Sequence, residues 1–381
     1  MNEVRPKSTA EVFEGSLAGR LRERIRSEGA ITFHDFMQAA LYDARDGYYN
    51  RQGIVRWGRT GDYRTSAESS SLFAHTFAAY FATLYEQLGA PARWTLFEAG
   101  AGAGHFAYGV LETFARDYPQ TYAATDYVID ETSADARTRA IKNLVPFNDR
   151  IAFRRLTEIE SFDGACIVFS NELLDAFPVH RVVMRGGKLF ELYVGIDRRD
   201  KFCWNTGKLS TTRLAAYLEQ LPASLLEEQI IEVNFAAEDF IKSAGERLRE
   251  GFIITVDYGA ETPELLTASH YRRGTLRGFY KHQLVENPLD DPGGRDLTTT
   301  IDWTQIRRAG DEAGLQTVLF ARQDEFLLHA GLLEILEREA ARAQDETARA
   351  QLRLSAREMI LPERLSQHFQ VMVQRKFIEN R

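Results

Sequence analysis

Short apolar runs alternate with helical segments from Trp94 onward, and this alternation constrains the fold more than any other feature of the chain. The apolar runs are WTLFEAG, DYVID, IAFRRL, ACIVFSNE, GFIITVDYG, LQTVLF and FQVMVQRKF. Helical segments such as FAYGVLETFARDY and EDFIKSAGERLREG lie between several of them. Strands that alternate with helices are typical of a parallel sheet covered by helices on both faces. The sequence therefore predicts an α/β fold.

Three regions depart from this alternation and define the expected domain organisation. Residues 1–90 are expected to be a helical N-terminal segment, because SSLFAHTFAAYFATLYEQLG places aromatic side chains at helical spacing. Residues 91–381 form the α/β domain, with an insertion at about 178–220 that begins with a β-hairpin around the glycine pair at 186–187. A second insertion, at about 330–366, is rich in Glu, Arg and Ala and is expected to form solvated helices.

A glycine-rich turn follows the first predicted strand. The run LFEAGAGAGHF contains Glu98, Gly100, Gly102 and Gly104. Such a turn directs backbone N–H groups to the carboxyl end of the sheet, where doubly wound folds bind nucleotides. The dinucleotide fingerprint is not matched, because His105 occupies the position of its third glycine. An acid before the turn would repel a pyrophosphate and favours a cationic ligand such as S-adenosylmethionine, although a purely structural turn is an alternative.

Two acids follow the second predicted strand. The run DYVIDETS ends this strand with Asp130 and Glu131, and either carboxylate can accept two hydrogen bonds from ribose hydroxyls. The alternative is an acidic N-cap of the next helix. An acid pair that follows a glycine turn by one strand favours the binding role.

The fourth predicted strand, residues 165–169, is almost continuously apolar and ends in a polar cluster. The cluster SNELLDAFP contains Asn171, Glu172 and Asp175. In a doubly wound sheet this strand end faces the reactive group of the cofactor. An amide beside two carboxylates can hold a cationic acceptor near a methyl donor, and the alternative is a capped helix start.

Composition and charge exclude several other classes of protein. The net charge is −8, so no overall basic field attracts nucleic acid. The two cysteines, Cys166 and Cys203, form no CxxC pair, which argues against a disulfide framework and a cysteine-based zinc site. No apolar run reaches about 18 residues, and the N-terminus lacks an apolar signal region. We therefore expect a cytoplasmic protein with no metal site, no membrane span and no nucleic-acid partner.

Long blocks of unusual sequence occur in order along nearly the whole chain. They include LYDARDGYYN, GDYRTSAESSSLFA, FEAGAGAG, IDETS, SNELLDAFPVHR, EVN, TVDYG and GTLRGFYKHQLVENPLDDPGGRDLTTTIDW. In these blocks the chain resembles the MidA-like S-adenosylmethionine-dependent methyltransferases, which are related to a mitochondrial complex I assembly factor that methylates arginine. The chain departs from the family pattern at Ala101 and Ala67, where proline is usual. Losing these prolines relaxes a turn and should not remove the binding groups.

The resemblance implies a Rossmann-like class I methyltransferase sheet of seven strands, with FQVMVQRKF as the last, antiparallel strand. It implies S-adenosyl-L-methionine as cofactor, with the three glycines forming the cofactor turn. Glu131 would bind the ribose in preference to Asp130, because E-x-S is the family spacing. Asn171 and Glu172 would stand over the reactive sulfonium.

The resemblance also assigns a role to the N-terminal segment and an acceptor to the reaction. Asp62, Thr65 and Ser66 would close the active site from that segment. The expected acceptor is an arginine of a partner protein, of the respiratory complex I subunit type, and the oligomeric state is left open. An arginine stays protonated because its pKa exceeds about 12, so carboxylates must hold the guanidinium in a bidentate fork.

The predicted catalytic residues follow from this requirement. Glu172 and Asp175 are the candidates for the fork, with Asp257 of TVDYG as the third, beside Asn171. Two other functions compete with this hypothesis. A nicotinamide-dependent oxidoreductase is disfavoured by the missing fingerprint and by the charge of Glu98. A non-enzymatic assembly chaperone that retains the methyltransferase fold is disfavoured by the intact glycine turn.

Overall fold

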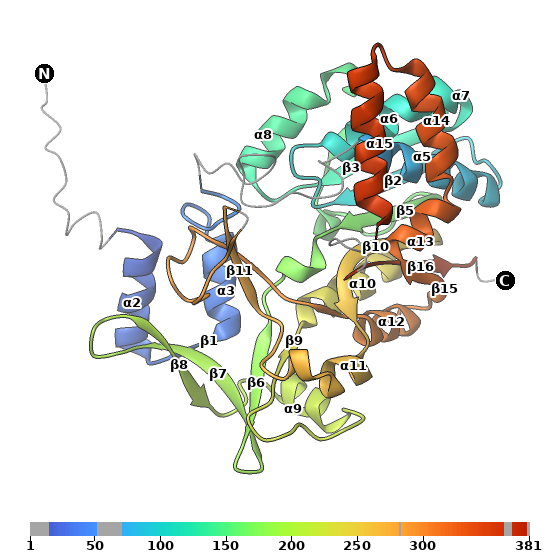
Figure 1. Ribbon diagram of the computed structural model, residues 1–381. Helices are drawn as coiled ribbons and strands as arrows, with labels where there is room; N and C mark the ends of the chain where they lie inside the picture. Colours follow the sequence, from blue (N-terminus) through green and yellow to red (C-terminus); the bar gives the residue numbers. More distant parts are fainter. Residues whose placement is uncertain (1–14, 52–70, 282, 362–367, 379–381) are drawn as a thin grey trace, which may run out of the picture.

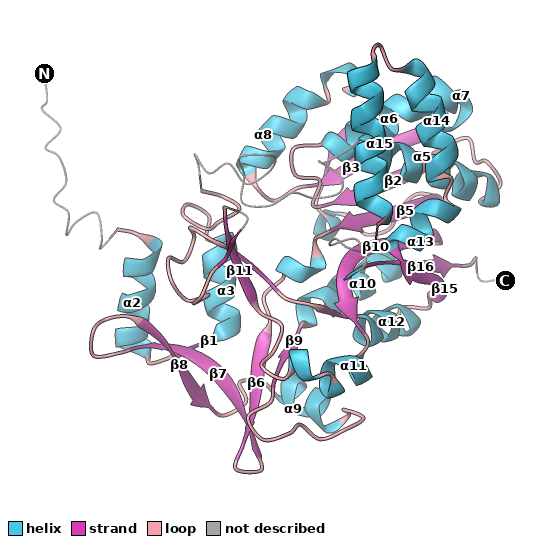
Figure 2. Ribbon diagram, in the orientation of Figure 1, coloured by secondary structure: helices cyan, strands magenta, loops and turns pink. Residues whose placement is uncertain are grey.

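The computed structural model describes residues 15–51, 71–281, 283–361 and 368–378. Its largest element is a mixed sheet of eight strands with helices on both faces (Figure 1, Figure 2). The strands are β2 (Trp94–Ala99), β3 (Thr125–Asp130), β4 (Ile151–Phe153), β5 (Ala165–Asn171), β10 (Glu250–Ala260), β14 (Ile301–Asp302), β15 (Gln316–Arg322) and β16 (Phe369–Lys376). Seven of them lie in the order β15-β16-β10-β5-β2-β3-β4, and β14 pairs with β10.

The strand directions agree with the sequence-based expectation. Strand β16 is antiparallel to both its neighbours, β10 and β15, whereas the pairs from β10 to β4 are parallel. The predicted α/β fold and antiparallel last strand are therefore confirmed. The predicted count of seven strands is corrected to eight. The difference arises because β10 extends past Asn171 of its partner β5, and its end pairs with the two residues of β14.

Each face of the sheet carries its own hydrophobic core. In β5, Ile167 and Phe169 belong to one core, while Cys166 and Val168 belong to the other. Successive side chains of a strand point to opposite faces, so a strand buried on both faces has a continuous apolar sequence. This is the physical reason why the run ACIVF could be interpreted as a central strand from sequence.

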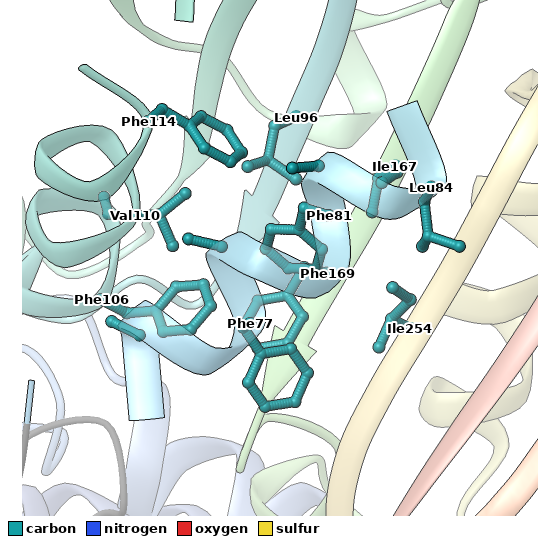
Figure 3. Packing of buried hydrophobic residues seen from close by; sticks show 14 of the residues in the cluster. Phe77, Phe81, Leu84, Leu96, Phe106, Val110, Phe114, Ile167, Phe169 and Ile254 are labelled. Atoms are coloured by element: carbon teal, nitrogen blue, oxygen red, sulfur yellow. The ribbon is translucent and has the colours of Figure 1, made fainter. Parts of the chain in front are cut away.

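Helices from both ends of the chain cover the first core. They are α5 (Ser71–Gln87), α6 (His105–Asp117), α13 (Gln323–His329), α14 (Leu332–Arg342) and α15 (Glu346–Ile360). Figure 3 shows Phe77 and Phe81 of α5 packed with Phe106 of α6 and Phe169 of β5. Helix α5 lies within the first 90 residues, yet it is an integral part of the main core. The second core lies under α10 (Phe235–Arg247) and α12 (Trp303–Glu312).

Several further helices are short or peripheral. They are α7 (Pro119–Ala124), α8 (Ala134–Asn143), α9 (Thr212–Glu219) and α11 (Thr262–Thr267), with 3-10 turns η1 (Val145–Phe147), η2 (Leu156–Glu158), η3 (Leu174–Ala176) and η4 (Ser269–Tyr271). The region predicted to form solvated helices contains α14 and α15. Within the described ranges, every helix is too short or too polar to cross a bilayer.

A second sheet of five strands lies beside the main sheet (Figure 1). Its strands are β1 (Ile31–Thr32), β6 (His180–Arg185), β7 (Lys188–Ile196), β8 (Phe202–Gly207) and β9 (Ile230–Val233). The predicted hairpin joins β6 to β7 through Gly186 and Gly187, whose φ angles of 56° and 71° suit a tight two-residue turn. Because β9 completes this sheet, the second sheet extends along the chain past residue 220.

The N-terminal helices α2 (Leu17–Glu28) and α3 (Phe33–Tyr42) pack on this second sheet. Phe33 and Phe36 of α3 contact Trp204 and Phe202 of β8, respectively. A small third sheet is formed by β11 (Arg277–Tyr280), β12 (Gln283–Leu284) and β13 (Asp296–Thr298). Leu297 of β13 belongs to the hydrophobic core between the N-terminal helices and the second sheet. This packing carries the end of α3 towards the carboxyl edge of the main sheet.

Candidate functional site

A cavity of about 720 Å³ lies at the carboxyl ends of β2, β3 and β5. Its volume falls in the range of about 300–1,000 Å³ that is usual for cofactor and ligand sites. The described lining comes from the glycine turn, the loops after β3, β4 and β5, one face of α10, and the end of α3 with the turn that follows it. The sequence predicted a site at the glycine turn and at the ends of β3 and β5, and the structure adds the loop after β4, α10 and the end of α3.

The glycine turn requires glycine for measurable reasons. Gly100, Gly102 and Gly104 have φ angles of 74°, 55° and 78°, a region that other residues rarely adopt. A Cβ atom on Gly100 would lie 2.9 Å from Cδ1 of Leu173, and one on Gly104 would lie 3.1 Å from Cβ of Ala140. Gly100 and Gly102 line the cavity, whereas Gly104 is the N-cap of α6 behind it.

Glu98 is a buried carboxyl group at the floor of this cavity. Its side chain is 4% exposed, and its Oε2 accepts a hydrogen bond of 2.7 Å from the Tyr127 hydroxyl. Burial raises the pKa of Glu98 to about 8, and the bond from Tyr127 opposes that rise. A cation bound nearby would favour the ionised carboxylate, because opposite charges lower the pKa of an acid. The geometry suits a cationic ligand.

Glu131 and Asp130 both line the cavity but are held differently. Glu131 accepts hydrogen bonds from the backbone N–H groups of Gly102 (2.8 Å) and Ser133 (2.7 Å), so it links the glycine turn to the loop after β3. Burial raises the pKa of Glu131 to about 7. Asp130 accepts a hydrogen bond from the Leu156 N–H (2.8 Å) and pairs with Arg155 (2.9 Å). Asp130 thus holds the loop after β4, and Glu131 is the inner carboxylate.

Asn171 and Glu172 form a polar step at the end of β5. The Nδ2 group of Asn171 donates to Oε1 of Glu172 at 3.2 Å. Within the described part of the chain, the buried Oδ1 of Asn171 has no hydrogen-bond partner. Glu172 has a φ of 51°, a strained conformation for a residue with a side chain. Both residues line the cavity, so this bend presents an amide oxygen and a carboxylate to it.

Asp175 and Asp257 form hydrogen bonds around η3 and Tyr258, and their predicted place in the acceptor fork stays a prediction. Neither belongs to the lining of the cavity. Asp257 accepts hydrogen bonds from the N–H groups of Leu174 (3.0 Å) and Asp175 (3.3 Å), and thereby satisfies the buried backbone of η3. Asp175 accepts a hydrogen bond of 2.6 Å from the Tyr258 hydroxyl. Burial raises the pKa of Asp175 to about 6 and raises that of Asp257 well above its usual range.

The predicted cofactor-closing residues Asp62, Thr65 and Ser66 lie outside the described residues, so their role stays a prediction. Sequence reasoning missed Tyr42 and Tyr49, which line the cavity from the end of α3 and the turn after it. The block LYDARDGYYN contains both residues. Its signal was a cluster of tyrosines around a glycine, directly after an amphipathic helix.

Comparison with known proteins gives a consistent picture. Residues 76–321 match the model of a protein family described as "Putative S-adenosyl-L-methionine-dependent methyltransferase". The matched region contains the glycine turn, Glu131 and the Asn171–Glu172 step. Among curated proteins, the chain is similar to the "Protein arginine methyltransferase NDUFAF7 homolog, mitochondrial" of Drosophila melanogaster, with 25% identity over 81% of this chain and 72% of that protein. The human "Protein arginine methyltransferase NDUFAF7, mitochondrial" is 24% identical over 92% of this chain and 81% of that protein.

Solved structures resemble the whole chain. A crystal structure from Burkholderia thailandensis with bound S-adenosyl-homocysteine aligns with a TM-score of 0.84 and 28% identity, over 98% of this chain and 95% of that one. A native crystal structure from the same organism aligns with a TM-score of 0.82 and 27% identity over the same shares. These similarities extend across both sheets and the N-terminal helices, because nearly the full length is aligned.

Proposed function

Because this chain belongs to the family of S-adenosyl-L-methionine-dependent methyltransferases, we propose that it transfers the methyl group of this cofactor to an arginine side chain of a partner protein. Family membership confirms the resemblance found in the sequence and gives the enzyme class and the cofactor. It also disfavours the nicotinamide-dependent alternative. The arginine acceptor is the more specific part of the proposal. It is supported by the names of the curated relatives and by the acidic residues that line the cavity.

The residues of the cavity fit the cofactor chemically. S-adenosyl-L-methionine supplies an electrophilic methyl group on a sulfonium, and it also carries an ammonium and a carboxylate. Glu98 and Glu131 offer the negative charge that a ligand with these cations requires. The turn from Gly100 to Gly102 presents backbone without side chains, so a bulky ligand can approach it closely.

The observation that carries the proposed acceptor is the polar step at the end of β5. Asn171 Oδ1 is a buried acceptor without a partner among the described residues, and the Glu172 carboxylate stands beside it. A guanidinium presents several N–H groups in a planar fork, which a carboxylate and an amide oxygen can accept together. Holding the cation in this way fixes its orientation and draws its charge towards Glu172, leaving another nitrogen for the transfer. That nitrogen bonds to the methyl carbon as the carbon–sulfur bond breaks, S-adenosyl-homocysteine leaves, and the one proton released passes to the Glu172 carboxylate. Precise alignment of that nitrogen is the main catalytic requirement of a displacement reaction.

Labelling with tritiated S-adenosyl-L-methionine tests this proposal, with a lysate from cells that lack the protein as the source of acceptors. We expect the wild type to transfer label to protein and Glu172→Gln to transfer it at least about a hundredfold more slowly, because a charge-assisted contact is lost. Calorimetric titration should give the wild type and Glu172→Gln cofactor affinities within about threefold of each other, since the substitution leaves the glycine turn intact.

The outcome of that experiment also separates the remaining alternative. A wild type that binds the cofactor but labels nothing would favour the assembly chaperone, and full activity of Glu172→Gln would contradict the assigned role. The protein partner, which we propose to be a respiratory complex I-type subunit, would be identified from the labelled peptides. The curated relatives are named as mitochondrial proteins, so they give no support to the cytoplasmic location, which stays a prediction.

A further inference from the structure

Two tyrosine rings form a part of the cavity wall to which no site residue predicted from the sequence contributes. Tyr42 is the last residue of α3, and Tyr49 lies in the following turn. Their ring centroids are 5.4 Å apart with an angle of 35° between the ring planes. Both residues are half-buried and both line the cavity. The pair comes from the part of the molecule that packs on the second sheet, so it is structurally separate from the glycine turn.

Hydrogen bonds at the hydroxyl ends fix the orientation of both rings. Tyr42 donates to the backbone oxygen of Ala176 at 3.1 Å, and Ala176 belongs to the loop that carries Glu172. Tyr49 donates to Oδ1 of Asp296 at 3.0 Å. Since these hydroxyl groups are engaged with the protein, the groups that the pair can offer to a bound molecule are its aromatic faces and edges.

The backbone of Tyr49 is tied to the loop that contains Glu131. The Ser133 hydroxyl donates to the Tyr49 oxygen, and the Ser133 N–H donates to Glu131. The Tyr42–Tyr49 pair is therefore held between the loops after β3 and β5. These loops carry the inner carboxylate and the Asn171–Glu172 step, so the pair has a fixed position relative to both.

Negative charge surrounds the pair. Burial raises the pKa of Tyr42, and the charges of Asp175, Asp296 and Glu131 raise it further. Glu172 is a fourth carboxylate near the pair, because it lines the cavity together with Ala176, the residue that Tyr42 contacts. An aromatic face attracts cations through its quadrupole, and nearby carboxylates strengthen the preference for positive charge.

We propose that Tyr42 and Tyr49 are specificity-determining residues that stack against the planar cation of the methyl acceptor and select a guanidinium over an ammonium or a neutral amide. The inference rests on the proposed function, because it assigns a wall to the same acceptor site. Planarity favours guanidinium, which stacks on aromatic rings and keeps its edge free for the fork at Glu172. An ammonium is a compact, strongly hydrated charge that gains less from a flat surface.

Binding of three small probes tests the proposal on the full-length protein saturated with S-adenosyl-homocysteine. The probes are the Nα-acetyl amides of arginine, lysine and citrulline, and binding is followed by NMR titration. We expect the wild type to bind the arginine amide about tenfold more tightly than the other two, because cation–π contacts and charge both favour it. Equal binding of arginine and citrulline amides, or no binding of the arginine amide, would overturn the proposal.

Variants of the pair separate ring stacking from packing. Tyr42→Leu and Tyr49→Leu should each weaken binding of the arginine amide about tenfold, while Tyr49→Phe, which keeps the ring, should stay within about threefold of wild type. Where a leucine variant fails to fold, Tyr49→4-cyanophenylalanine keeps the ring volume and weakens its negative face, so it should lose several-fold in affinity. Unchanged binding in a folded leucine variant, or in this variant, would contradict a stacking role.

The same measurements distinguish failure of this inference from failure of the proposed function. If S-adenosyl-homocysteine binds normally and label is transferred to protein, but the probes do not discriminate, then only the assignment of the tyrosine pair is wrong. If neither cofactor binding nor label transfer occurs, the proposed function itself fails. Affinity for S-adenosyl-homocysteine should stay within about threefold of wild type in all the tyrosine variants, since neither ring belongs to the glycine turn.

Discussion

At the scale of single residues, position at a strand end made the carboxylates predictable, but their direction did not follow from sequence. Glu131 and Glu172 each follow an apolar strand and line the cavity. Asp257 also ends an apolar run, yet it points under η3. Val256 pairs with Asn171 and packs in the first core, so the next side chain along β10 takes the opposite face. Strand pairing sets this register, and no local pattern in TVDYG reveals it.

The buried carboxyl groups predict how cofactor binding changes with pH. The folded pKa of Glu131 is raised to about 7, so this group is largely protonated at pH 5.5 and mostly ionised at pH 7.5. Ribose hydroxyls donate stronger hydrogen bonds to an ionised carboxylate than to a carboxylic acid, so affinity for S-adenosyl-L-methionine should rise about tenfold between these two values. Calorimetry across this window measures the change. A flat profile in the wild type would contradict the role of Glu131.

A matched variant identifies the group responsible. Glu131→Gln should bind the cofactor more weakly at pH 7.5 and lose most of the rise, since its side chain does not ionise. The raised pKa also affects the ligand-free protein. A carboxyl whose folded pKa is raised stabilises the fold while it is protonated, and that contribution is lost as pH rises through about 7. The melting temperature without ligand should fall over the same window, and less so in Glu131→Gln.

At the scale of elements, local chemistry made most helices and strands predictable. The hairpin between β6 and β7 follows from its glycine pair, and α6 follows from the glycine turn that precedes it. The end of the inserted region did not follow from sequence, because β9 is only four residues long and is defined by pairing with β6. The short strand β14 is likewise defined only by its contact with β10. Elements defined by long-range pairing carry little local signal.

The glycine turn provides a prediction with a built-in control. Gly100→Ala places a side chain at a φ of 74° and 2.9 Å from Leu173, in the lining of the cavity. Gly187→Ala imposes similar strain at a φ of 71°, but its Cβ atom meets nothing within 4 Å. Each should lose about 1–2 kcal/mol of unfolding free energy from backbone strain, with a further loss in Gly100→Ala from the contact. Chemical denaturation measures this loss.

Cofactor affinity separates the two glycine variants. Gly100→Ala should bind S-adenosyl-L-methionine at least about tenfold more weakly, because the turn must shift to relieve the contact with Leu173. Gly187→Ala should bind it as the wild type does, since the β6–β7 hairpin contributes nothing to the cavity lining among the described residues. Equal affinities for both variants would mean that the glycine turn is not part of the cofactor site.

At the scale of the whole molecule, segments distant in sequence complete one core and one site. Helix α5 fills the centre of the core on the main sheet, and α14 and α15 pack beside it although they follow it by more than two hundred residues (Figure 1). The turn after α3 reaches the cavity only because α3 packs on the second sheet. Tyr42 and Tyr49 were missed for this reason, since their place in the site depends on packing between the two sheets.

Phe77 tests how far α5 is integrated in the main fold. It is fully buried, and its ring contacts those of Phe106 and Phe169 (Figure 3). It also contacts the ring of Phe326, so its neighbours come from three other elements. Phe77→Ala should cost about 3–5 kcal/mol of unfolding free energy through lost contacts and a cavity. The control Leu354→Ala, at a site on α15 that is 55% exposed, should change stability by less than about 0.5 kcal/mol. Similar losses for both variants would contradict a core role for α5.

The identity of the amino acid that receives the methyl group tests the central claim most directly. After labelling with tritiated S-adenosyl-L-methionine, acid hydrolysis of the acceptor protein and chromatography against standards separate methylarginine from methyllysine, methylhistidine and methyl esters. The acidic cavity with the Asn171–Glu172 step predicts that the label elutes as methylarginine and is lost in Glu172→Gln. Label in any other amino acid, or equal methylarginine from Glu172→Gln, would contradict this account.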